Sequence, residues 1–340
     1  MFLNPIGLLS GAAAKAALAE RVAVPLSNTG LSFTHVEKID GGTGTVAGRT
    51  AAPRLATAEC APFAEARVPF AGVPLDRPRI MGILNVTPDS FSDGGDYADP
   101  AQAAERALAL AEEGADIVDV GGESTRPGAA PISVAEEIDR VMPAIEAAAG
   151  AGLVVSVDTR NAETMRAAAA GGARIVNDVT ALSHDPAALD AVAASGLSVV
   201  LMHIQGTPET MQAAPRYKLA SSDIRAWLGD HADACVAAGI PRERIAVDPG
   251  IGFGKTDVHN MEILDRAAMF HGIGCAVAIG VSRKSFIGRI AGIEAPGDRL
   301  PGTVAATLIA LSRGVQIHRV HDVAAARQAL DIWDALPRGT

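Results

Sequence analysis

Three polar residues at the ends of short apolar runs have the chemistry to hold a flat heterocycle. Asp158 ends the run LVVSVD, Asn177 lies near the end of RIVND, and Asp248 ends IAVD. Because a buried carboxylate is costly without hydrogen-bond donors, two of them in one cavity predict a ligand that supplies donors. Asn177 adds both a donor and an acceptor. Together they predict a site for an amide-and-amine edge, as in a guanine-like or pterin-like ring.

A second group of side chains suits an anion. Arg126, Arg319 and His321 offer donors that can carry positive charge, and Asn85 is a polar residue near the end of another apolar run. Guanidinium groups match phosphate oxygens through paired hydrogen bonds. Lys284 could reach either group of residues. The sequence therefore predicts a pocket with a heterocycle at its base and an anion near its rim.

These residues can form one site only in a fold that brings the ends of several strands together. The order of predicted strands and helices after Ile80 indicates such a fold. Short β-like runs alternate with amphipathic or Ala-rich helical segments about eight times, which predicts a (β/α)8 TIM barrel with an extra N-terminal segment. A doubly wound open sheet is the alternative, because counting strands cannot show that a sheet closes. The expected strands are 80–86, 116–121, 153–158, 174–179, 198–204, 245–248, 276–281 and 316–321.

Side-chain alternation gives these strands a common design. Ile83 shares a face with Asn85, and Ile317 shares one with Arg319, so an apolar residue is followed two positions later by a polar one. In a barrel this arrangement makes a packed floor below a polar mouth. For other polar residues near strand ends, a helix cap or a structural hydrogen bond is an equally good interpretation. Those residues are Asp119, Asp178 and Thr180.

Composition narrows the class of protein. Hydrophobic residues make up 49% of the 340 residues and aromatic ones only 4%, which suits helices on a parallel sheet better than a β-sandwich. The formal net charge of -10 argues against general nucleic-acid binding, which needs a basic surface. No apolar run approaches the roughly 20 residues of a membrane span. The N-terminus lacks the basic start of a signal peptide, and the three cysteines are widely separated, so we expect a cytoplasmic protein.

The region before Ile80 predicts two further parts. Residues 1–40 should form a small N-terminal element with a helix over 10–20 followed by a β-hairpin. Residues 41–79 are dense in Gly, Ala, Pro and Thr, which predicts a linker or irregular segment. Residues 80–340 are then the catalytic barrel domain.

Two glycine-rich stretches suggest nucleotide binding at first sight, but their details oppose it. PGIGFGKT resembles a phosphate-binding loop, yet Pro249 stands where the first glycine should be, so we predict a strand-to-helix loop. GGESTRPG is also predicted to be a loop, which exposes Thr125 and Arg126 and gives its serine no nucleophile-elbow context.

From about residue 80 to its end, the chain resembles the dihydropteroate synthase family. The similarity rests on eight motifs in family order, each at a predicted strand end or in the following loop: ILNVTPDSFSDGG, DVGGESTRPGA, SVDT, NDV, MHIQGTPETMQ, DPGIGFGK, GVSRKSFIG and RVHDV. One motif would be weak support, whereas eight in order are specific. The resemblance implies a TIM barrel that joins 6-hydroxymethyl-7,8-dihydropterin pyrophosphate to p-aminobenzoate, releasing pyrophosphate and 7,8-dihydropteroate in folate biosynthesis.

The resemblance also implies roles for individual residues. The pterin would be held by Asp158, Asn177, Asp248 and Lys284, with Arg319 over its face. The pyrophosphate would be bound by Asn85, Arg126, Arg319 and His321, so that the catalytic set is Asn85, Arg126, Lys284, Arg319 and His321. The p-aminobenzoate site would contain Phe91, Thr125, Arg126, Pro127, Lys284 and Ser285. Mg2+ would be reached through Asn85 and Asp93.

Two alternatives remain open from the sequence. A pterin-dependent methyltransferase domain has a similar barrel and similar pterin contacts, and a non-catalytic pterin-binding paralogue is a different class. The SRKS segment and the RVHD pair favour the synthase, because they would serve an aryl carboxylate and a pyrophosphate. The resemblance further implies a homodimer and competition by sulfonamides. It gives no role to the first 79 residues, which exceed the short lead-in usual for the family.

Overall fold

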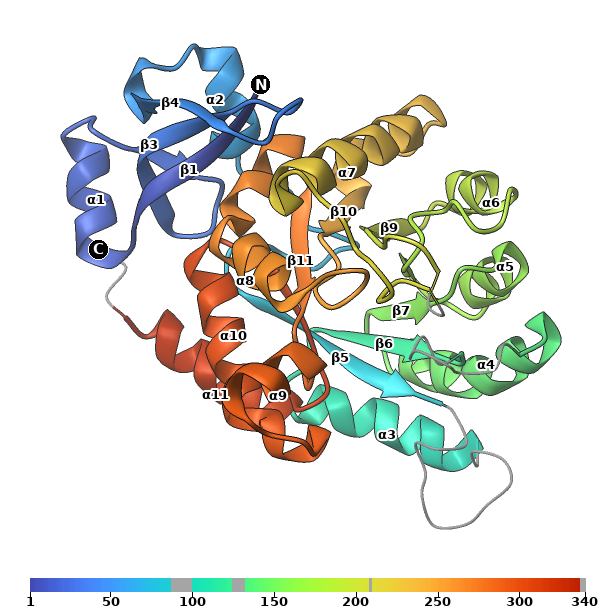
Figure 1. Cartoon of the computed structure of the whole chain (residues 1–340). Coiled ribbons are helices and arrows are strands. Elements are labelled where there is room, and N and C mark those ends of the chain that lie inside the picture. Colours follow the sequence, from blue (N-terminus) through green and yellow to red (C-terminus); the bar gives the residue numbers. More distant parts are fainter. Residues whose placement is uncertain (87–99, 124–131, 208–209, 337–340) are drawn as a thin grey trace.

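A closed ring of eight parallel strands forms the centre of the molecule in a computed structural model (Figure 1). The structure describes residues 1–86, 100–123, 132–207 and 210–336. The strands follow the ring order β10-β11-β12-β5-β6-β7-β8-β9, which confirms the predicted barrel and rules out the open sheet. They are β5 (Arg79–Asn85), β6 (Ile117–Gly121), β7 (Val155–Asp158), β8 (Ile175–Asp178), β9 (Ser198–Met202), β10 (Ile245–Asp248), β11 (Ala276–Gly280) and β12 (Ile317–Val320).

Helices follow the strands and cover the outside of the ring (Figure 1). Five of them correspond to the amphipathic or Ala-rich segments that the sequence shows at 101–113, 134–149, 163–170, 224–238 and 304–312, although two of these helices begin four residues earlier. In the barrel they are α3 (Pro100–Glu112), α4 (Val134–Gly150), α5 (Ala162–Ala170), α6 (Ala188–Ser195), α7 (Ala220–Ala237), α8 (Asp257–Asp265), α9 (Ser285–Ala291), α10 (Leu300–Ser312) and α11 (Val323–Asp334). Short 3-10 turns are η3 (Arg242–Arg244), η4 (Ala267–Ile273) and η5 (Pro296–Arg299).

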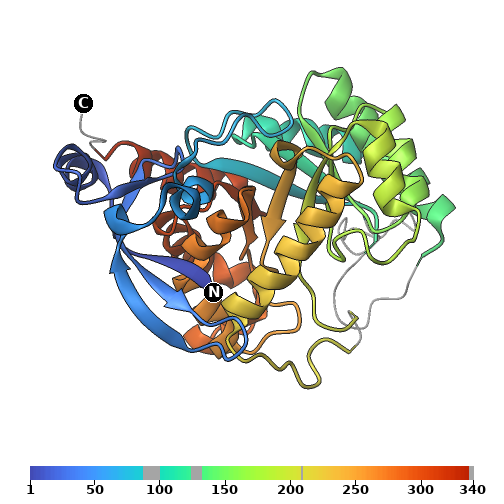
Figure 2. The same ribbon diagram turned by 90° about the horizontal axis from the view of Figure 1, so that it is seen from above.

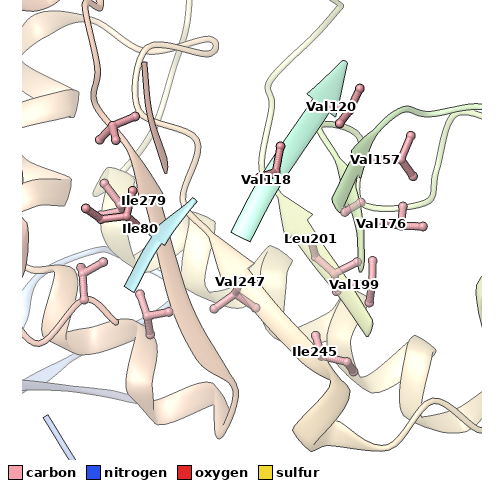
Figure 3. Packing of buried hydrophobic residues seen from close by; sticks show 14 of the residues in the cluster. Ile80, Val118, Val120, Val157, Val176, Val199, Leu201, Ile245, Val247 and Ile279 are labelled. Carbon is pink, nitrogen blue, oxygen red and sulfur yellow. The ribbon is translucent and has the colours of Figure 1, made fainter. Parts of the chain in front are cut away.

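The main core lies between the ring and the helices. Figure 3 shows outward-facing strand residues such as Ile80, Val118 and Val247, all buried. The strand residues next to them in sequence face the other way and fill the inside of the ring. A strand buried on both faces is apolar along most of its length, which is why these segments were recognisable as short apolar runs.

A second core fills the lower part of the ring. Ile175, Ala246 and Ile317 belong to it and stand two positions before Asn177, Asp248 and Arg319, so these strands form the packed floor that alternation predicted. Met81 also belongs to this core and stands four positions before Asn85. The segment before β5 closes the ring from below, because Phe70 and Leu75 pack into the same cluster. The polar residues are thereby left at the opposite, carboxyl-terminal rim.

The N-terminal region forms an antiparallel sheet beside the barrel (Figure 2). Its central strand, β3, pairs with β1 on one side and with β2 and β4 on the other. Its apolar face packs on Ala268 of η4 and against Trp333 of α11. The elements are β1 (Phe2–Leu9), α1 (Gly11–Ala19), β2 (Val24–Leu26), β3 (Leu31–Ile39), β4 (Val46–Ala51), η1 (Ala52–Arg54) and α2 (Thr57–Ala64).

This region is more regular than its sequence suggested. The predicted helix and hairpin correspond to α1 and to β2 with β3. Residues 41–79, interpreted as a linker or irregular segment, contain β4, η1 and α2. In addition, β1 was not predicted. Within the described part of the chain, no helix is long and apolar enough to cross a membrane.

Candidate active site

The predicted site residues come from different strands and meet at the carboxyl-terminal rim of the ring. Asn85 in β5, Asp158 in β7 and Asn177 in β8 stand at one level, because Asn85 pairs in register with Gly121, Gly121 with Asp158, and Asp158 with Asn177. Asp248 ends β10, and Arg319 lies in β12. Because each of these strands ends in a polar residue, side chains as far apart in sequence as Asn85 and Arg319 lie on the same face of the barrel.

Two glycines keep this rim open. A Cβ atom on Gly121 would lie 3.4 Å from the Cβ of Asp158 and 3.7 Å from Oδ1 of Asn85. A Cβ atom on Gly280 would lie 3.6 Å from the Cβ of Arg319 and 3.8 Å from Nζ of Lys284. Larger residues at these two strand ends would occupy the space between the polar groups.

The guanidinium of Arg319 in β12 bonds to carboxylates on two other strands, Asp119 in β6 and Asp158 in β7. Its Nε lies 2.6 Å from Oδ2 of Asp119, and its Nη2 lies 2.6 Å from Oδ2 of Asp158. Nδ2 of Asn177 donates to the same Asp119 oxygen at 3.1 Å. We call Asp119, Asp158, Asn177 and Arg319 the Arg319 cluster. It fixes the orientation of three side chains that were predicted to contact the heterocycle.

Asp119 is the cluster member whose role the sequence left open. Its side chain is fully buried, and its carboxylate accepts a hydrogen bond from Nε of Arg319 while that of Asp158 accepts one from Nη2. Its Oδ1 has no hydrogen-bond partner among the described residues. The alternation rule could have found it, because Asp119 follows the inward-facing Ile117 by two positions.

Burial dominates the protonation behaviour of the rim. It raises the pKa of the Asp158 carboxyl to about 7, although Arg319 offsets part of that rise. It also raises the pKa of Asp248, against the opposing effects of Lys284 and the N–H of Gly250. The pKa of Lys284 falls to about 8 because burial disfavours its charge, and Asp248 partly compensates. Pockets with such displaced pKa values are typical of functional sites.

Lys284 is held by the loop that follows β10. Its Nζ donates to the backbone oxygen of Ile251 and lies 4.7 Å from the ring centroid of Phe253. A Cβ atom on Gly252 would lie 3.2 Å from Cδ of Lys284. The loop therefore lies along the lysine stem and directs the ammonium group toward Asp248 and Gly280.

The same loop is the glycine-rich stretch 249–256, and it connects β10 to α8 as predicted. Oδ1 of Asp248 accepts a hydrogen bond from Gly250 at 2.7 Å. Lys255 does not point to solvent but is buried, and its Nζ lies 3.0 Å from Nδ1 of His203 and 2.8 Å from the backbone oxygen of Phe253. This lysine ties the loop to the end of β9, a role that its sequence did not indicate.

His321 stands one residue beyond β12, so it lies just outside the strand that was predicted to include it. Its Nδ1 lies 3.0 Å from Oγ of Ser282, which also accepts from its backbone N–H at 3.1 Å. His321 lines a groove of about 350 Å³ together with Arg283 and the first turn of α11. Ser285, which the family resemblance assigns to the p-aminobenzoate site, is the first residue of α9.

Several predicted residues lie outside the described part of the chain. They are Phe91, Asp93, Thr125, Arg126 and Pro127. The first residues of the loop that follows β6 are described. Glu123 accepts two hydrogen bonds from Arg160, at 3.0 and 2.9 Å, and Arg140 donates to the backbone oxygen of Gly122 at 3.1 Å. The loop that carries Thr125 and Arg126 therefore starts from a firmly held position.

The described side chains at the rim provide few ligands for a metal ion. Within the described residues, no group of three or more His, Cys, Asp or Glu side chains could hold one. Asn85 presents its amide at the rim beside Gly121. Mg2+ often keeps several waters and binds through one or two protein oxygens plus substrate phosphates. The donors present thus fit an ion that is shared with a phosphate-bearing substrate, not one enclosed by protein.

Comparison with known proteins decides the family. The family model described as pterin binding enzyme matches residues 81–321. The dihydropteroate synthase of Escherichia coli (strain K12) is 46% identical over 262 residues, which cover 77% of this chain and 92% of that protein. The dihydropteroate synthase of Neisseria meningitidis serogroup B is also 46% identical, over 94% of its length.

This chain belongs to the dihydropteroate synthase family.

Solved structures of dihydropteroate synthases agree with this assignment. The Xanthomonas albilineans enzyme with 4-aminobenzoic acid has a TM-score of 0.75 and 46% identity, covering 81% of this chain and 99% of that one. A structure of the enzyme from the same organism in complex with 7,8-dihydropteroate has a TM-score of 0.73 and 44% identity, covering 81% and 100%. The Yersinia pestis enzyme in a sulfonamide drug complex has a TM-score of 0.74 and 44% identity, covering 77% and 95%.

Membership in the dihydropteroate synthase family makes the protein an enzyme of the transferase class and favours neither alternative from the sequence analysis. The family match begins at Met81. The N-terminal sheet therefore precedes the part of the chain that defines the family.

Proposed function

We propose that the enzyme condenses 6-hydroxymethyl-7,8-dihydropterin pyrophosphate with p-aminobenzoate to give 7,8-dihydropteroate and pyrophosphate. The observation that carries this proposal is the meeting of Asp158, Asn177, Asp248, Lys284 and Arg319 at one rim. The similar synthase of Xanthomonas albilineans has been solved with 4-aminobenzoic acid and in complex with 7,8-dihydropteroate. The acidic and amide groups at this rim match the donor-rich edge of a pterin.

In this proposal the pterin lies across the mouth of the ring. Asp158 and Asp248 accept hydrogen bonds from its ring N–H and amino groups, and Asn177 supplies a donor and an acceptor. Lys284 donates to the ring from the side of Asp248. Arg319, already oriented by Asp119, covers one face of the ring, where its planar guanidinium can stack.

The diphosphate leaves first. The C–O bond between the methylene carbon and the diphosphate breaks, and the electron pair stays with the diphosphate. Asn85, Arg126, Arg319 and His321 bind that group, and Mg2+ held through Asn85 and Asp93 would help to neutralise its charge. The carbocation that remains is conjugated with the electron-rich dihydropterin. This conjugation lowers the barrier to the loss of pyrophosphate before any nucleophile attacks.

The amine of p-aminobenzoate then attacks the methylene carbon. A C–N bond forms, and the nitrogen loses a proton to solvent, so no strong base is needed beforehand. Phe91, Thr125, Arg126, Pro127, Lys284 and Ser285 would hold this substrate. Because backbone N–H groups point out of the start of α9 at Ser285, that end suits a carboxylate.

We also propose a homodimer in the cytoplasm. Exposed apolar residues occur on three helices that touch one another, α8, α9 and α10, and they include Val258, Ile290 and Ile309. The ion pair between Arg289 and Asp257 joins α9 to α8 beside two of them. An exposed apolar face of this kind fits a second copy of the chain. Separately, we propose that sulfonamides compete with p-aminobenzoate for its site in each subunit.

One assay tests the proposed reaction. Purified protein is incubated with the pterin pyrophosphate, labelled p-aminobenzoate and Mg2+, and the products are separated. We expect labelled dihydropteroate, and we expect Arg126→Ala chiefly to impair turnover and the use of p-aminobenzoate. Methyl transfer to a corrinoid without formation of dihydropteroate would support the methyltransferase alternative. Pterin binding without any product would support the non-catalytic one.

A further inference from the structure

We propose that the N-terminal sheet, residues 1–51, positions the pterin pocket from outside the barrel by bracing residues 210–219, the part of the β9–α7 segment that leads into α7. The inference rests on the proposed function, because it names a second determinant of pterin binding. It assigns a role to the part of the chain that precedes the family match. The chain of contacts runs from this sheet to the β9–α7 segment, then to the loop after β10, and ends at Lys284.

The first contact joins the β3–β4 loop to the start of α7. Nζ of Lys218 donates to the backbone oxygen of Gly42 at 2.7 Å. Gly44 lies so close to Leu219 that an added Cβ would be 2.9 Å from its Cβ and 3.0 Å from its backbone nitrogen. Gly44 also has a φ of +72°, a conformation that glycine adopts without penalty. The two backbones therefore touch where a larger residue would separate them.

The β3–β4 loop is itself rigid enough to act as a brace. Oδ1 of Asp40 accepts hydrogen bonds from the N–H groups of Gly42 and Thr43, at 2.8 and 2.9 Å. The N–H of Gly44 donates to the oxygen of Asp40 at 2.7 Å. The loop thus keeps its shape without help from α7.

A second set of contacts holds the same sheet against the first turns of α7. The guanidinium of Arg225 lies 4.4 Å from the ring centroid of Phe2. Glu37 pairs with Arg266 at 3.5 Å, and Arg266 pairs with Glu262, which accepts two hydrogen bonds from Ser221. In Figures 1 and 2 the N-terminal strands accordingly lie beside one end of α7.

The braced segment reaches the loop after β10 on its other side. Nε2 of Gln212 donates to the oxygen of Gly252 at 2.6 Å, and the hydroxyl of Tyr217 donates to the oxygen of Gly254 at 2.8 Å. Tyr217 immediately precedes Lys218, so one short stretch contacts the N-terminal sheet and the pocket loop at once. These bonds hold the loop whose Ile251 oxygen and Phe253 ring receive Lys284.

The physical consequence is a change in substrate binding without a change in fold. Loops are held by few contacts and shift easily when one is lost. The loop after β10 also keeps its inner anchor, because Lys255 is buried and bound to His203 and Phe253. Loss of the outer brace should therefore loosen the position of Lys284 while leaving the barrel intact.

A matched glycine pair tests the inference. Gly44→Ala places a methyl group against Leu219, whereas Gly48→Ala adds the same group to β4 where nothing lies within 4 Å. We expect Gly44→Ala to weaken pterin binding, measured by calorimetry, by about two- to thirtyfold. Gly48→Ala should bind as the unmodified enzyme does. The thermal midpoint of Gly48→Ala should stay close to that of the unmodified enzyme, whereas the φ of +72° at Gly44 should lower that of Gly44→Ala by a few degrees. The Lys218 variants, which leave the backbone unchanged, separate the loss of binding from this strain.

Substitutions of Lys218 provide a second test. Because this side chain is exposed, replacing it should not disturb folding. Lys218→Met removes the donor to Gly42 and should weaken pterin binding, and Lys218→Arg, which keeps a donor, should restore it. Equal pterin affinity in Lys218→Met, Gly44→Ala and Gly48→Ala would overturn the inference. Formation of dihydropteroate by the unmodified enzyme is measured in parallel. Its absence would contradict the proposed function, and its presence with unchanged affinities would contradict the brace alone.

Discussion

The two carboxylates of the rim are neutralised by different partners. Asp158 faces Arg319, whose other side is held by Asp119. Asp248 faces Lys284 and accepts from the N–H of Gly250. Each carboxylate therefore has one cation beside it and retains acceptor capacity for a ligand.

The displaced pKa values predict the pH dependence of pterin binding. The pKa of Asp158 is raised to about 7, so in the free enzyme this group is mostly protonated below that pH and accepts hydrogen bonds from the pterin less strongly than the carboxylate does. The pKa of Lys284 is lowered to about 8, so above that pH it loses a donor proton. Calorimetric affinity should rise toward pH 7, by up to about tenfold per unit, and fall above pH 8.

Asp158→Asn serves as the control for that profile, because its amide does not titrate. The weakening below neutral pH should disappear in this variant, while the decline at high pH persists. An unchanged acidic side of the profile in Asp158→Asn would show that another group causes it.

Asp119→Asn tests the role of the Arg319 cluster. The amide keeps the volume but removes the charge that orients Arg319, so we expect pterin affinity to fall by about two- to thirtyfold, as for a residue that acts through a neighbour of the ligand. The control is Asp178→Asn, whose carboxylate is also buried but accepts from the N–H groups of Thr180 and Leu182. Equal affinities in the two variants would contradict the proposed role of Asp119.

At the residue scale, the sequence predicted which side chains face the mouth but not how they pair. Alternation within a strand places Asp158 and Arg319 correctly, since each follows an inward-facing residue by two positions. The bond between Arg319 and Asp119 joins β12 to β6, which are separated in the ring by β5. No pattern within one strand contains that information, because it depends on the closure and stagger of the whole barrel.

At the scale of single elements, Arg160 anchors the loop that follows β6 through its hydrogen bonds to Glu123. We expect Arg160→Gln to raise the KM for p-aminobenzoate several-fold, because Glu123 loses both of its hydrogen bonds to this residue, while pterin affinity stays nearly constant. Steady-state kinetics with each substrate varied separately measures this difference. Arg77→Gln is the control, since Arg77 pairs with Asp116 at the other end of the barrel.

If Arg160→Gln and Arg77→Gln gave the same KM for p-aminobenzoate, the start of this loop would not determine the second substrate's site. A similar rise in the KM of both substrates for Arg160→Gln would indicate a general loss of structure at the rim instead.

Element boundaries were predictable in the barrel and much less so before it. Buried parallel strands are short apolar runs, so all eight stand out from the sequence. In contrast, β1 contains Pro5 and Gly7, which argue against a strand. Most of β4 is exposed and carries Gly48 and Arg49, so it lacks the alternation that marks a half-buried strand. Both depend on pairing with β3.

At the scale of the whole molecule, Arg67 joins the N-terminal region to the barrel. Its guanidinium donates to the backbone oxygens of Cys275 and His271 at 3.1 and 3.0 Å, and also to those of Glu65 and Pro62. Arg67→Met would leave these acceptors without their donor. We expect the free energy of unfolding, measured with urea, to fall by roughly 2–4 kcal/mol.

Arg49→Met is the control for this prediction, because the Arg49 side chain is exposed and its partner Glu37 keeps its second pair, with Arg266. This change should cost about 1 kcal/mol. The unmodified protein should unfold in one transition, since the N-terminal sheet and the barrel share a buried contact around Ala268. Two separate transitions would show that the two parts fold independently.

The central claim is that separate strand ends form one pterin pocket, and the calorimetric affinity of Asp248→Ala for the pterin tests it most directly. Asp265→Ala, which changes an exposed carboxylate paired with Arg313, is the control. We predict that Asp265→Ala binds normally and that Asp248→Ala loses at least about thirtyfold in affinity, because a buried acceptor beside Lys284 is gone. Normal pterin affinity in a folded Asp248→Ala protein would contradict the account.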